Sequence, residues 1–423
     1  MTWPMIFGVL SLMSFQLVDS AFIGRLGIEP LAAQGFTMPI QMMVIGLQVG
    51  LGIATTALIS RVLGKGNVKE ASQIGGLVVL TGAASVFALC LLVWFGRDPI
   101  LLFLGAHENL FPIIDSYWKV WLGSAWLGAM LYFAYSLCRS HGNTMLPGIL
   151  MVVTSLLNMG LDPLFMFTFG MGLNGAAWAT IAAFGFGILV VFPLVVGRNW
   201  LSFNWNGLEI RKSLGDLGKI MAPAMVSQML PPLASTLATK LVAGFGSAAV
   251  AAWALGSRVE FFAIVVVLAL TMSMPPMIAR MYGAGDRRGV TTTLSLAMKF
   301  VFVWQLLIGG LIWLMSSQLS NLLANDSQVI QILHVHLMWV PLSLSLLGIC
   351  ILLVSACNAL GMPIRGLIIS ILRLFACFLP LVWLGANTVG LNGIFIGAAV
   401  GNIMAGVVAY KMYRMGYAET KTE

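Results

Sequence analysis

Long apolar stretches separated by short polar loops run along the whole 423-residue chain. Each stretch has about 20 residues, and a helix of that length, at about 1.5 Å of rise per residue, crosses a hydrocarbon core roughly 30 Å thick. The pattern therefore predicts an all-α membrane protein with twelve transmembrane helices. We place them at residues 4–24, 38–60, 73–95, 116–138, 145–167, 173–197, 218–240, 250–277, 293–315, 331–355, 363–385 and 391–412.

Short motifs recur along the chain and reveal an internal repeat. Arg61-Val-Leu-Gly-Lys-Gly-Asn67 matches Arg280-Met-Tyr-Gly-Ala-Gly-Asp286, 219 residues later, and Gly172-Leu-Asn-Gly175 matches Gly390-Leu-Asn-Gly393, 218 residues later. Each copy holds six predicted helices, an even number, so both copies enter the membrane from the same side as parallel repeats. The predicted parts are an amino-terminal six-helix lobe (1–197), a cytoplasmic linker (198–217), a carboxy-terminal six-helix lobe (218–412) and a cytoplasmic tail (413–423).

Composition and charge agree with this topology. Apolar residues make up 60% of the chain and charged residues 9%, which excludes a soluble protein and makes the lipid bilayer the expected solvent. Fifteen Lys and Arg residues lie in alternate loops on one side, against three, Arg25, Arg97 and Lys119, near the other. By the positive-inside rule both termini are cytoplasmic. The net charge of +8 thus reflects topology, and we expect no nucleic-acid partner.

Charged residues also lie within predicted spans away from the helix ends, and we single out Asp19, Asp162, Arg258, Glu260 and Arg373. A charge at mid-bilayer costs at least about 2.5–3.5 kcal/mol on insertion scales, so each one indicates a partner, a water-filled cavity or a proton. Neither aspartate has an acidic counterpart in the second copy, which predicts an ion site in one lobe only. We expect Glu260 to pair locally with Arg258 or to join Arg373, and these three are secondary candidates.

Helix geometry predicts that the two aspartates meet. Asp19 lies about 23 Å and Asp162 about 25 Å from the inner boundary, Asn158 lies one turn below Asp162 on the same face, and Thr180 descends to the same level. Two neighbouring acids in a low dielectric favour a shared proton, and the same oxygens would suit a sodium ion. Alternatively, Asn158 and Asp162 brace a helix kink at Pro163 while Asp19 only bonds a neighbour.

Motifs around these residues resemble a known family. Leu17-Val-Asp-Ser-Ala-Phe-Ile-Gly-Arg-Leu-Gly27 resembles the first-helix signature of multidrug and toxic compound extrusion (MATE) transporters. Asn158-Met-Gly-Leu-Asp-Pro-Leu-Phe165, followed by residues 170–180, resembles their fifth- and sixth-helix signature, and Ser257-Arg-Val-Glu-Phe261 resembles their eighth-helix segment. The match spans nearly the whole chain, and its first motif is more similar to the DinF-like branch than to the NorM-like branch.

The resemblance implies twelve helices in two lobes forming a V, a location in the bacterial inner membrane, and export of cationic or amphipathic drug-like molecules against entry of protons or sodium. It implies ion coupling at four matched residues and a bend of the first helix at Pro4. The coupling residues are Asp19, Asn158, Asp162 and Thr180. The first helix also begins closer to Met1 than the resemblance implies, so the native chain is expected to have a longer lead.

Together these observations predict a secondary-active multidrug efflux antiporter that is monomeric, is not an enzyme, needs no cofactor and couples to protons. Gln34, Tyr132 and Tyr135 are candidates for an aromatic substrate cavity. Sodium coupling through the same site and a lipid-linked precursor flippase are the alternatives; a flippase would be expected to have extra helices and a strongly cationic cavity. The pair His334 and His336 is two residues apart on a helix and points in two directions, which disfavours a metal site.

Overall fold

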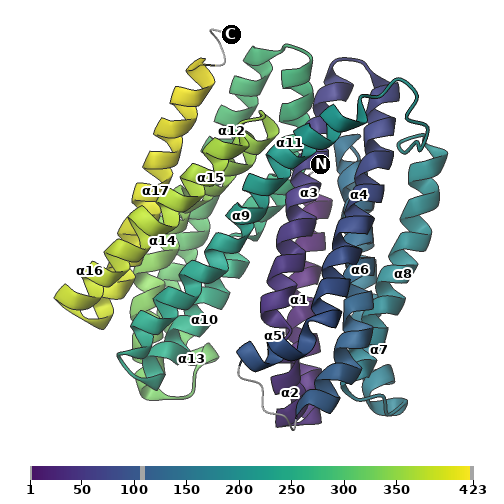
Figure 1. Cartoon of the computed structure of the whole chain (residues 1–423). Helices are drawn as coiled ribbons and strands as arrows, with labels where there is room; N and C mark the ends of the chain where they lie inside the picture. The colour runs from purple at the N-terminus through teal and green to yellow at the C-terminus, as the bar shows by residue number, and fades with distance from the viewer. Residues whose placement is uncertain (1, 105–109, 420–423) are drawn as a thin grey trace. The chain divides into compact units, whose positions relative to one another are not determined.

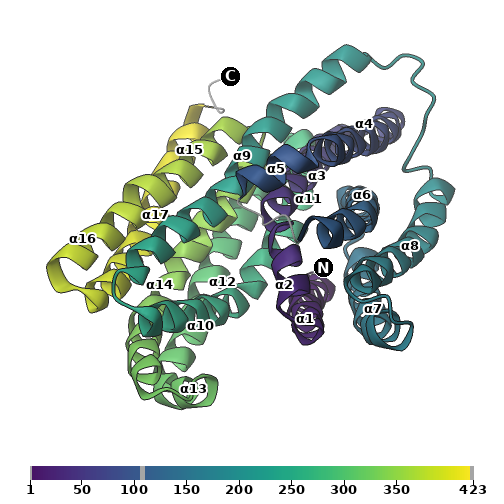
Figure 2. The same ribbon diagram turned by 60° about the horizontal axis from the view of Figure 1, so that its bottom comes forward.

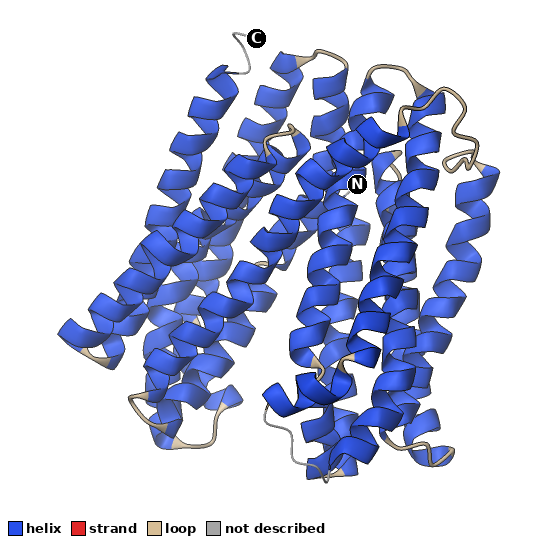
Figure 3. Ribbon diagram, viewed as in Figure 1, coloured by secondary structure: helices blue, strands red, loops and turns tan. Residues whose placement is uncertain are grey.

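The structure is a computed structural model that describes residues 2–104 and 110–419. These residues are helical with short connections and contain no strand (Figure 3). Eleven helices of the described chain are long and apolar enough to cross a membrane. The seventh predicted span lies within α9 (Ile210–Ala243), whose 34 residues include Pro, Ser, Thr and Gln and make it less apolar than those eleven. The predicted fold class, an all-α membrane protein, is confirmed.

The chain divides into two compact units, which we call the amino-terminal unit (Met1–Met225) and the carboxy-terminal unit (Val226–Glu423). The amino-terminal unit contains α1 (Thr2–Leu26), α2 (Ile28–Gly35), α3 (Met38–Gly64), α4 (Val68–Phe95), α5 (Arg97–Phe103), α6 (Phe111–Ser140), α7 (Met145–Pro163), the π-helix η2 (Leu164–Thr168), α8 (Leu173–Gly197) and the first half of α9 (Figure 1). The carboxy-terminal unit contains the rest of α9, α10 (Ser247–Ala263), α11 (Val265–Gly283), α12 (Arg287–Leu314), α13 (Ser316–Leu323), α14 (Ser327–Ala359), α15 (Pro363–Ile371), the π-helix η3 (Leu372–Phe378), α16 (Leu379–Val389) and α17 (Leu391–Glu419).

Glycines at matching positions of the two repeats adopt the same backbone conformation. Each has a positive φ, which a Cβ atom would make costly, so glycine is favoured there. The pairs are Gly66 (82°) and Gly285 (79°), Gly142 (84°) and Gly361 (78°), and Gly172 (56°) and Gly390 (73°). After the first pair, Asn67 and Asp286 each accept a hydrogen bond from a backbone N–H three residues on, so both cap the helix that follows. The repeated motifs thus encode the same turns.

Two predicted elements differ in the structure. The predicted helix 250–277 is interrupted at Ile264, where ψ is 5°, between α10 and α11. The hydrogen bonds Ile264 N to Glu260 O and Leu268 N to Ile264 O, both 3.0 Å, continue across this point, so the interruption is a distortion of one residue. At the other end, α17 continues to Glu419, so most of the predicted tail extends the last helix.

In the amino-terminal unit, α1 packs along α7, and α6 packs along α8 (Figure 2). Small residues allow the first pair to approach closely: a Cβ atom on Gly148 would lie 2.5 Å from the carbonyl of Pro4, and one on Gly8 would lie 3.1 Å from the carbonyl oxygen of Gly148. Because α7 also packs against α8, residues of α1, α7 and α8 can meet inside this unit. In the carboxy-terminal unit, α14 packs against α10, α11, α12 and α17.

The linker between the repeats is fastened to the start of α4. Ser202 N donates to the backbone oxygen of Ser72 (3.0 Å), and the Gln73 side chain donates to the backbone oxygens of Asn204 (2.8 Å) and Asn206 (3.2 Å). The linker backbone is thereby paired with the amino-terminal unit over several residues, which satisfies polar groups that have no helix partner.

Candidate functional site

Asn158 and Asp162 form the centre of a polar cluster inside the amino-terminal unit. They lie four residues apart on one face of α7, and both are completely buried. Thr180 of α8 places its hydroxyl oxygen 3.0 Å from the Asn158 amide. Since α7 and α8 run antiparallel through a short connection, the packing of the two helices alone brings the three side chains together.

The Asn158 amide is oriented by its two neighbours. Its nitrogen donates to both Asp162 oxygens (3.1 and 3.0 Å) and its oxygen accepts from the Thr180 hydroxyl (3.0 Å), which satisfies an ionised carboxylate. A protonated Asp162 would instead donate its O–H to the amide oxygen once the amide turns over. The amide nitrogen would then face Thr180, whose hydroxyl can donate to the backbone oxygen of Ala176 (3.0 Å). The same heavy atoms therefore serve a charged or a neutral Asp162.

Asp19 approaches this cluster from α1. Its Oδ2 accepts a long hydrogen bond from Gln34 Nε2 (3.4 Å), while its Oδ1 is buried without a hydrogen-bond partner. Asp19 and Asp162 are close enough to interact electrostatically. The structure thus brings together Asp19, Asn158, Asp162 and Thr180, and adds Gln34, which sequence reasoning placed in the substrate cavity.

Tyr117 of α6 is a further member that sequence reasoning missed. Its ring is buried, and its phenol lies within electrostatic range of both Asp19 and Asp162. A tyrosine near the end of a membrane helix is common at the lipid interface, so its position alone carried no signal. Only the tertiary structure shows that this tyrosine is buried near the two acids.

A π-helical turn follows Asp162 directly. Pro163 ends α7, and the backbone continues as η2 over Leu164–Thr168. Proline removes one helix hydrogen bond, and π-turns in helices often occur at functional sites. The hydrogen bonds of Asn158 run to Asp162 and Thr180, and Asp19 bonds Gln34, so ion coupling and bracing of this distortion both stay predictions.

Residues 4–164 and 223–384 match the MatE family model. This chain belongs to the MATE family. It is 30% identical to a FAD transporter of Shewanella oneidensis over 97% of this chain and 92% of that protein. It is 24% identical to the probable multidrug resistance protein YpnP of Bacillus subtilis over 98% and 93% of the two chains. Its structure superposes on the bent form of the Vibrio cholerae MATE transporter VcmN with a TM-score of 0.97, at 58% identity over 99% of this chain and 95% of that one.

Membership of the MATE family confirms the resemblance seen in the motifs and makes this chain a multi-pass membrane transporter. The family consists of transporters, in agreement with the expectation that the chain is not an enzyme. Assignment to the DinF-like branch stays a prediction.

Pro4 lies in the first turn of α1 in this MATE protein. The helix runs unbroken from Thr2 to Leu26, so the structure shows no bend at Pro4. A proline in the first turn removes no hydrogen bond, because the first N–H groups of a helix have no partner within it. The expected bend at this residue remains a prediction about another state of the transporter.

The two tyrosines expected to line a substrate cavity differ in exposure. Tyr132 is half-buried, and its ring lies 5.1 Å from the guanidinium of Arg139. Tyr135 is 4% exposed and lies in the core of the unit, so in this state it offers no surface to a substrate. Contact of either residue with a substrate stays a prediction.

The charged residues of the carboxy-terminal unit are arranged differently from the expectation. Glu260 accepts a bond from His336 Nε2 at 2.6 Å, rather than pairing with Arg258 or Arg373. Arg258 is exposed on α10, and Arg373 lies in η3 within reach of the Cys350 thiol. We expected Glu260 to pair with Arg258 because the two are close in sequence. Residues two apart on a helix face different directions, however, and the packing of α10 on α14 brings His336 to Glu260 instead.

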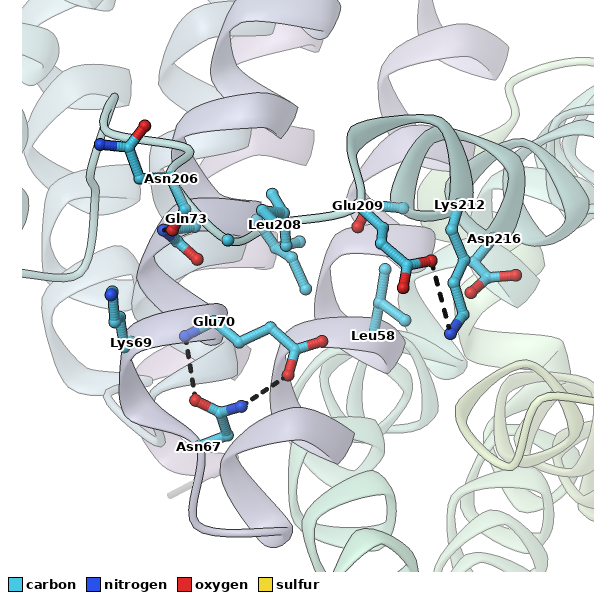
Figure 4. A pocket seen from close by; sticks show the side chains of 13 residues that line it. Leu58, Asn67, Lys69, Glu70, Gln73, Asn206, Leu208, Glu209, Lys212 and Asp216 are labelled. Carbon is cyan, nitrogen blue, oxygen red and sulfur yellow. Dashed lines mark hydrogen bonds and ion pairs between the residues drawn. The ribbon is translucent and has the colours of Figure 1, made fainter.

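A polar hollow of about 300 Å³ lies between the start of α4, the linker and the start of α9 (Figure 4). Its charged residues have both signs: Lys69, Glu70, Glu209, Lys212 and Asp216. Lys212 and Glu209 pair at 3.9 Å. This hollow lies near the α3–α4 turn, at the opposite end of the unit from the α7–α8 turn that follows Asp162 (Figure 1). It is therefore separate from the aspartate cluster.

Proposed function

We propose that this MATE protein is a secondary-active antiporter that exports cationic or amphipathic small molecules across a bacterial inner membrane in exchange for protons. One observation carries the proposal: two interacting carboxyl groups, Asp19 and Asp162, lie beside an amide, Asn158, that can serve either protonation state of Asp162. Buried acids of this kind in a membrane bundle are typical of proton pathways. Each chain carries the complete cluster, so a monomer suffices.

A proton that enters the cluster binds a carboxyl group and relieves the repulsion between the two acids. When Asp162 takes the proton, its O–H donates to the amide oxygen of Asn158, whose nitrogen turns to Thr180. When Asp162 loses the proton, the amide reverses and donates to the carboxylate. The cluster thus exchanges one proton with only a turn of the Asn158 amide, and the rest of the unit responds to the change in charge.

The response is proposed to lie in α1, because Asp19 and Pro4 are on this helix and its contact with α7 is made by small residues. The shared proton can also bind Asp19, where it removes the charge that Gln34 binds, and this neutralisation favours a rearranged α1 and a smaller cavity. Substrate and proton then bind preferentially to different states, and this difference couples their movements. The structure of VcmN described as a bent form supports a change of shape in a close relative.

FAD is a second candidate substrate. The relative named a FAD transporter shares 30% of its residues with this chain, whereas YpnP shares 24% and the multidrug export protein MepA of Staphylococcus aureus shares 23%. FAD is a large aromatic anion, so it differs in charge from the cationic substrates of the first proposal. Both substrates use the same coupling scheme, and transport assays separate them directly.

The test is export from proteoliposomes with one ion gradient imposed at a time. With a pH difference alone, we expect uphill transport of a fluorescent organic cation or of FAD, which an uncoupler abolishes. Export with a sodium gradient but not with a pH difference would replace the proton by sodium at Asp19, Asn158, Asp162 and Thr180. Export that requires no gradient would refute antiport altogether. Asp216→Asn, which removes an exposed carboxylate paired with Lys219 at 3.6 Å, is the matched control for loss of an acid.

A further inference from the structure

The carboxy-terminal unit contains a buried histidine that the proposed coupling cycle does not use. His336 of α14 has no exposed surface, and its Nε2 lies 2.6 Å from Oε1 of Glu260 on α10. Its Nδ1 is buried without a hydrogen-bond partner. The Glu260 side chain is 23% exposed, so the pair is reached from its carboxylate side.

Neighbouring residues form a slot that fits the imidazole ring. Trp253 and Phe395 meet it edge to face, with ring centroids 5.4 and 5.0 Å away. Gly256 of α10 lies flat against it, because a Cβ atom there would come within 2.5 Å of Nε2. His336 is therefore held against Glu260 by the two aromatic rings and by the space that Gly256 leaves.

The internal repeat relates this slot to the aspartate cluster of the other unit. Cys138 matches Cys357 at an offset of 219, and the same offset takes Tyr117, which lies near both aspartates, to His336. It also takes Asp19 to Ala238, which packs in one core cluster with Trp253 and Phe395. Each unit therefore carries a titratable side chain at the same position of its fourth span, beside a carboxyl group.

We propose that Glu260 and His336 form a second proton-binding site, in the carboxy-terminal unit. Two acceptor atoms do not approach to 2.6 Å without a proton between them, so one proton is shared by Nε2 and Oε1. With this proton alone the pair has a net charge of −1. A second proton, bound at Nδ1 or at the free carboxylate oxygen, brings the net charge to zero. The site thus takes up and releases one proton, and no other bond is made or broken.

Other titratable side chains on the described helices of this unit do not pair with Glu260 or His336. They are His334 on α14, Arg258 on α10, Lys240 on α9, Lys299 on α12 and Arg373 on η3. Among the described residues, none of these groups forms an ion pair with Glu260 or His336. Arg373 interacts with Cys350, which lies fourteen residues along α14 from His336, about 21 Å at 1.5 Å per residue.

A buried charged pair contributes little to stability by itself, because removing two charges from water costs about as much as their attraction returns. Apolar residues could fill the slot as well. Proton exchange would explain why an ionisable pair occupies this slot, whereas packing alone would not. This inference is independent of the proposed function, since it concerns proton binding and not which substrate or ion is transported.

The experiment observes the histidines directly by NMR. The chain has only four, so full-length protein with ¹³C-labelled histidine in lipid nanodiscs gives few signals. His336→Gln identifies the signal of His336, and His334→Gln, two residues away, is the matched control. The signal is followed between pH 5 and 9, and we expect it to change with pH in the wild type and to respond differently in Glu260→Gln, which loses the carboxylate that contacts the ring.

Two further outcomes complete the test. Asp162→Asn should leave the His336 titration unchanged, because Asp162 belongs to the cluster of the other unit. A His336 signal that does not change over this pH range, or that titrates identically in Glu260→Gln, would overturn the proposal. If His336→Gln does not fold, replacing the other three histidines one at a time identifies the His336 signal by elimination, and the wild-type measurement still decides the result.

Discussion

Replacing Gly175 with alanine should disturb the aspartate cluster without touching any of its side chains. Gly175 of α8 lies against η2, and a Cβ atom there would be 2.7 Å from the backbone nitrogen of Met166 and from the carbonyl carbon of Phe165. Backbone atoms cannot rotate away. Since ordinary contact begins near 3.4 Å, Gly175→Ala must separate η2 from α8 by about 0.7 Å.

The magnitude follows from this displacement. Overpacking of this size costs about 1–3 kcal/mol, and the better helix propensity of alanine returns up to about 1 kcal/mol. Met166 lies eight residues after Asn158, and Gly175 lies five before Thr180, so a movement of α7 together with η2 stretches the 3.0 Å contact between Asn158 and Thr180 to about 3.7 Å. A hydrogen bond is lost at that length. Its net value of about 1 kcal/mol predicts a decrease in proton-driven transport of about fivefold.

The assay compares Gly175→Ala with Gly185→Ala in the same helix, where a Cβ atom would meet nothing within 4 Å. Both variants are reconstituted at equal amounts, and export driven by a pH difference is measured together with the thermal unfolding midpoint. Gly185→Ala should match the wild type in transport and equal or exceed it in stability. Gly175→Ala should show reduced transport and a lower unfolding midpoint. Unchanged transport and unfolding in Gly175→Ala, or equal losses in the two variants, would refute the reasoning.

Three further predictions concern charged residues. Asp19→Asn should abolish proton-driven efflux while the protein remains folded by size-exclusion chromatography, because it removes the carboxyl group and keeps the shape; wild-type efflux in a well-expressed variant would contradict this. Glu260→Gln should impair export less than Asp162→Asn at equal expression in a cell-based drug-resistance assay, and an equal or greater loss would move the coupling site to the carboxy-terminal unit. Asp286→Ala removes the helix cap on Gly289 N (2.8 Å) and should lower stability by about 1 kcal/mol in thermal unfolding, with transport retained; no shift would show that this cap is solvated instead.

The aspartate cluster was accessible from the sequence for a geometric reason. In a membrane every span is a helix of known rise, so a residue's position in its span gives its depth. Two residues four apart share a face, which placed Asn158 with Asp162. Depth and face were enough to expect Thr180 nearby, and its hydroxyl lies 3.0 Å from the Asn158 amide.

The depth and face of a residue do not show which helices are neighbours. The other contacts could therefore not be predicted from the sequence. Tyr117 was missed because only the packing of α6 within the amino-terminal unit brings it near the two acids. Glu260 was expected to meet Arg258, its near neighbour in sequence, and instead meets His336, 76 residues away. Hydropathy also did not show the interruption at Ile264, since hydrogen bonding and apolar character continue through it.

The sequence by itself determined the class of the molecule: apolar stretches of membrane-crossing length, an internal repeat with matching glycine turns, and a few charged residues too costly to keep in a bilayer without a use. Only the tertiary structure decided the partners of those charges. A side chain's partner depends on the rotation of its helix and on the helix packed against it, and both are settled by the fit of many small contacts, such as those of Gly148, Gly175 and Gly256, that leave no periodic pattern in the chain.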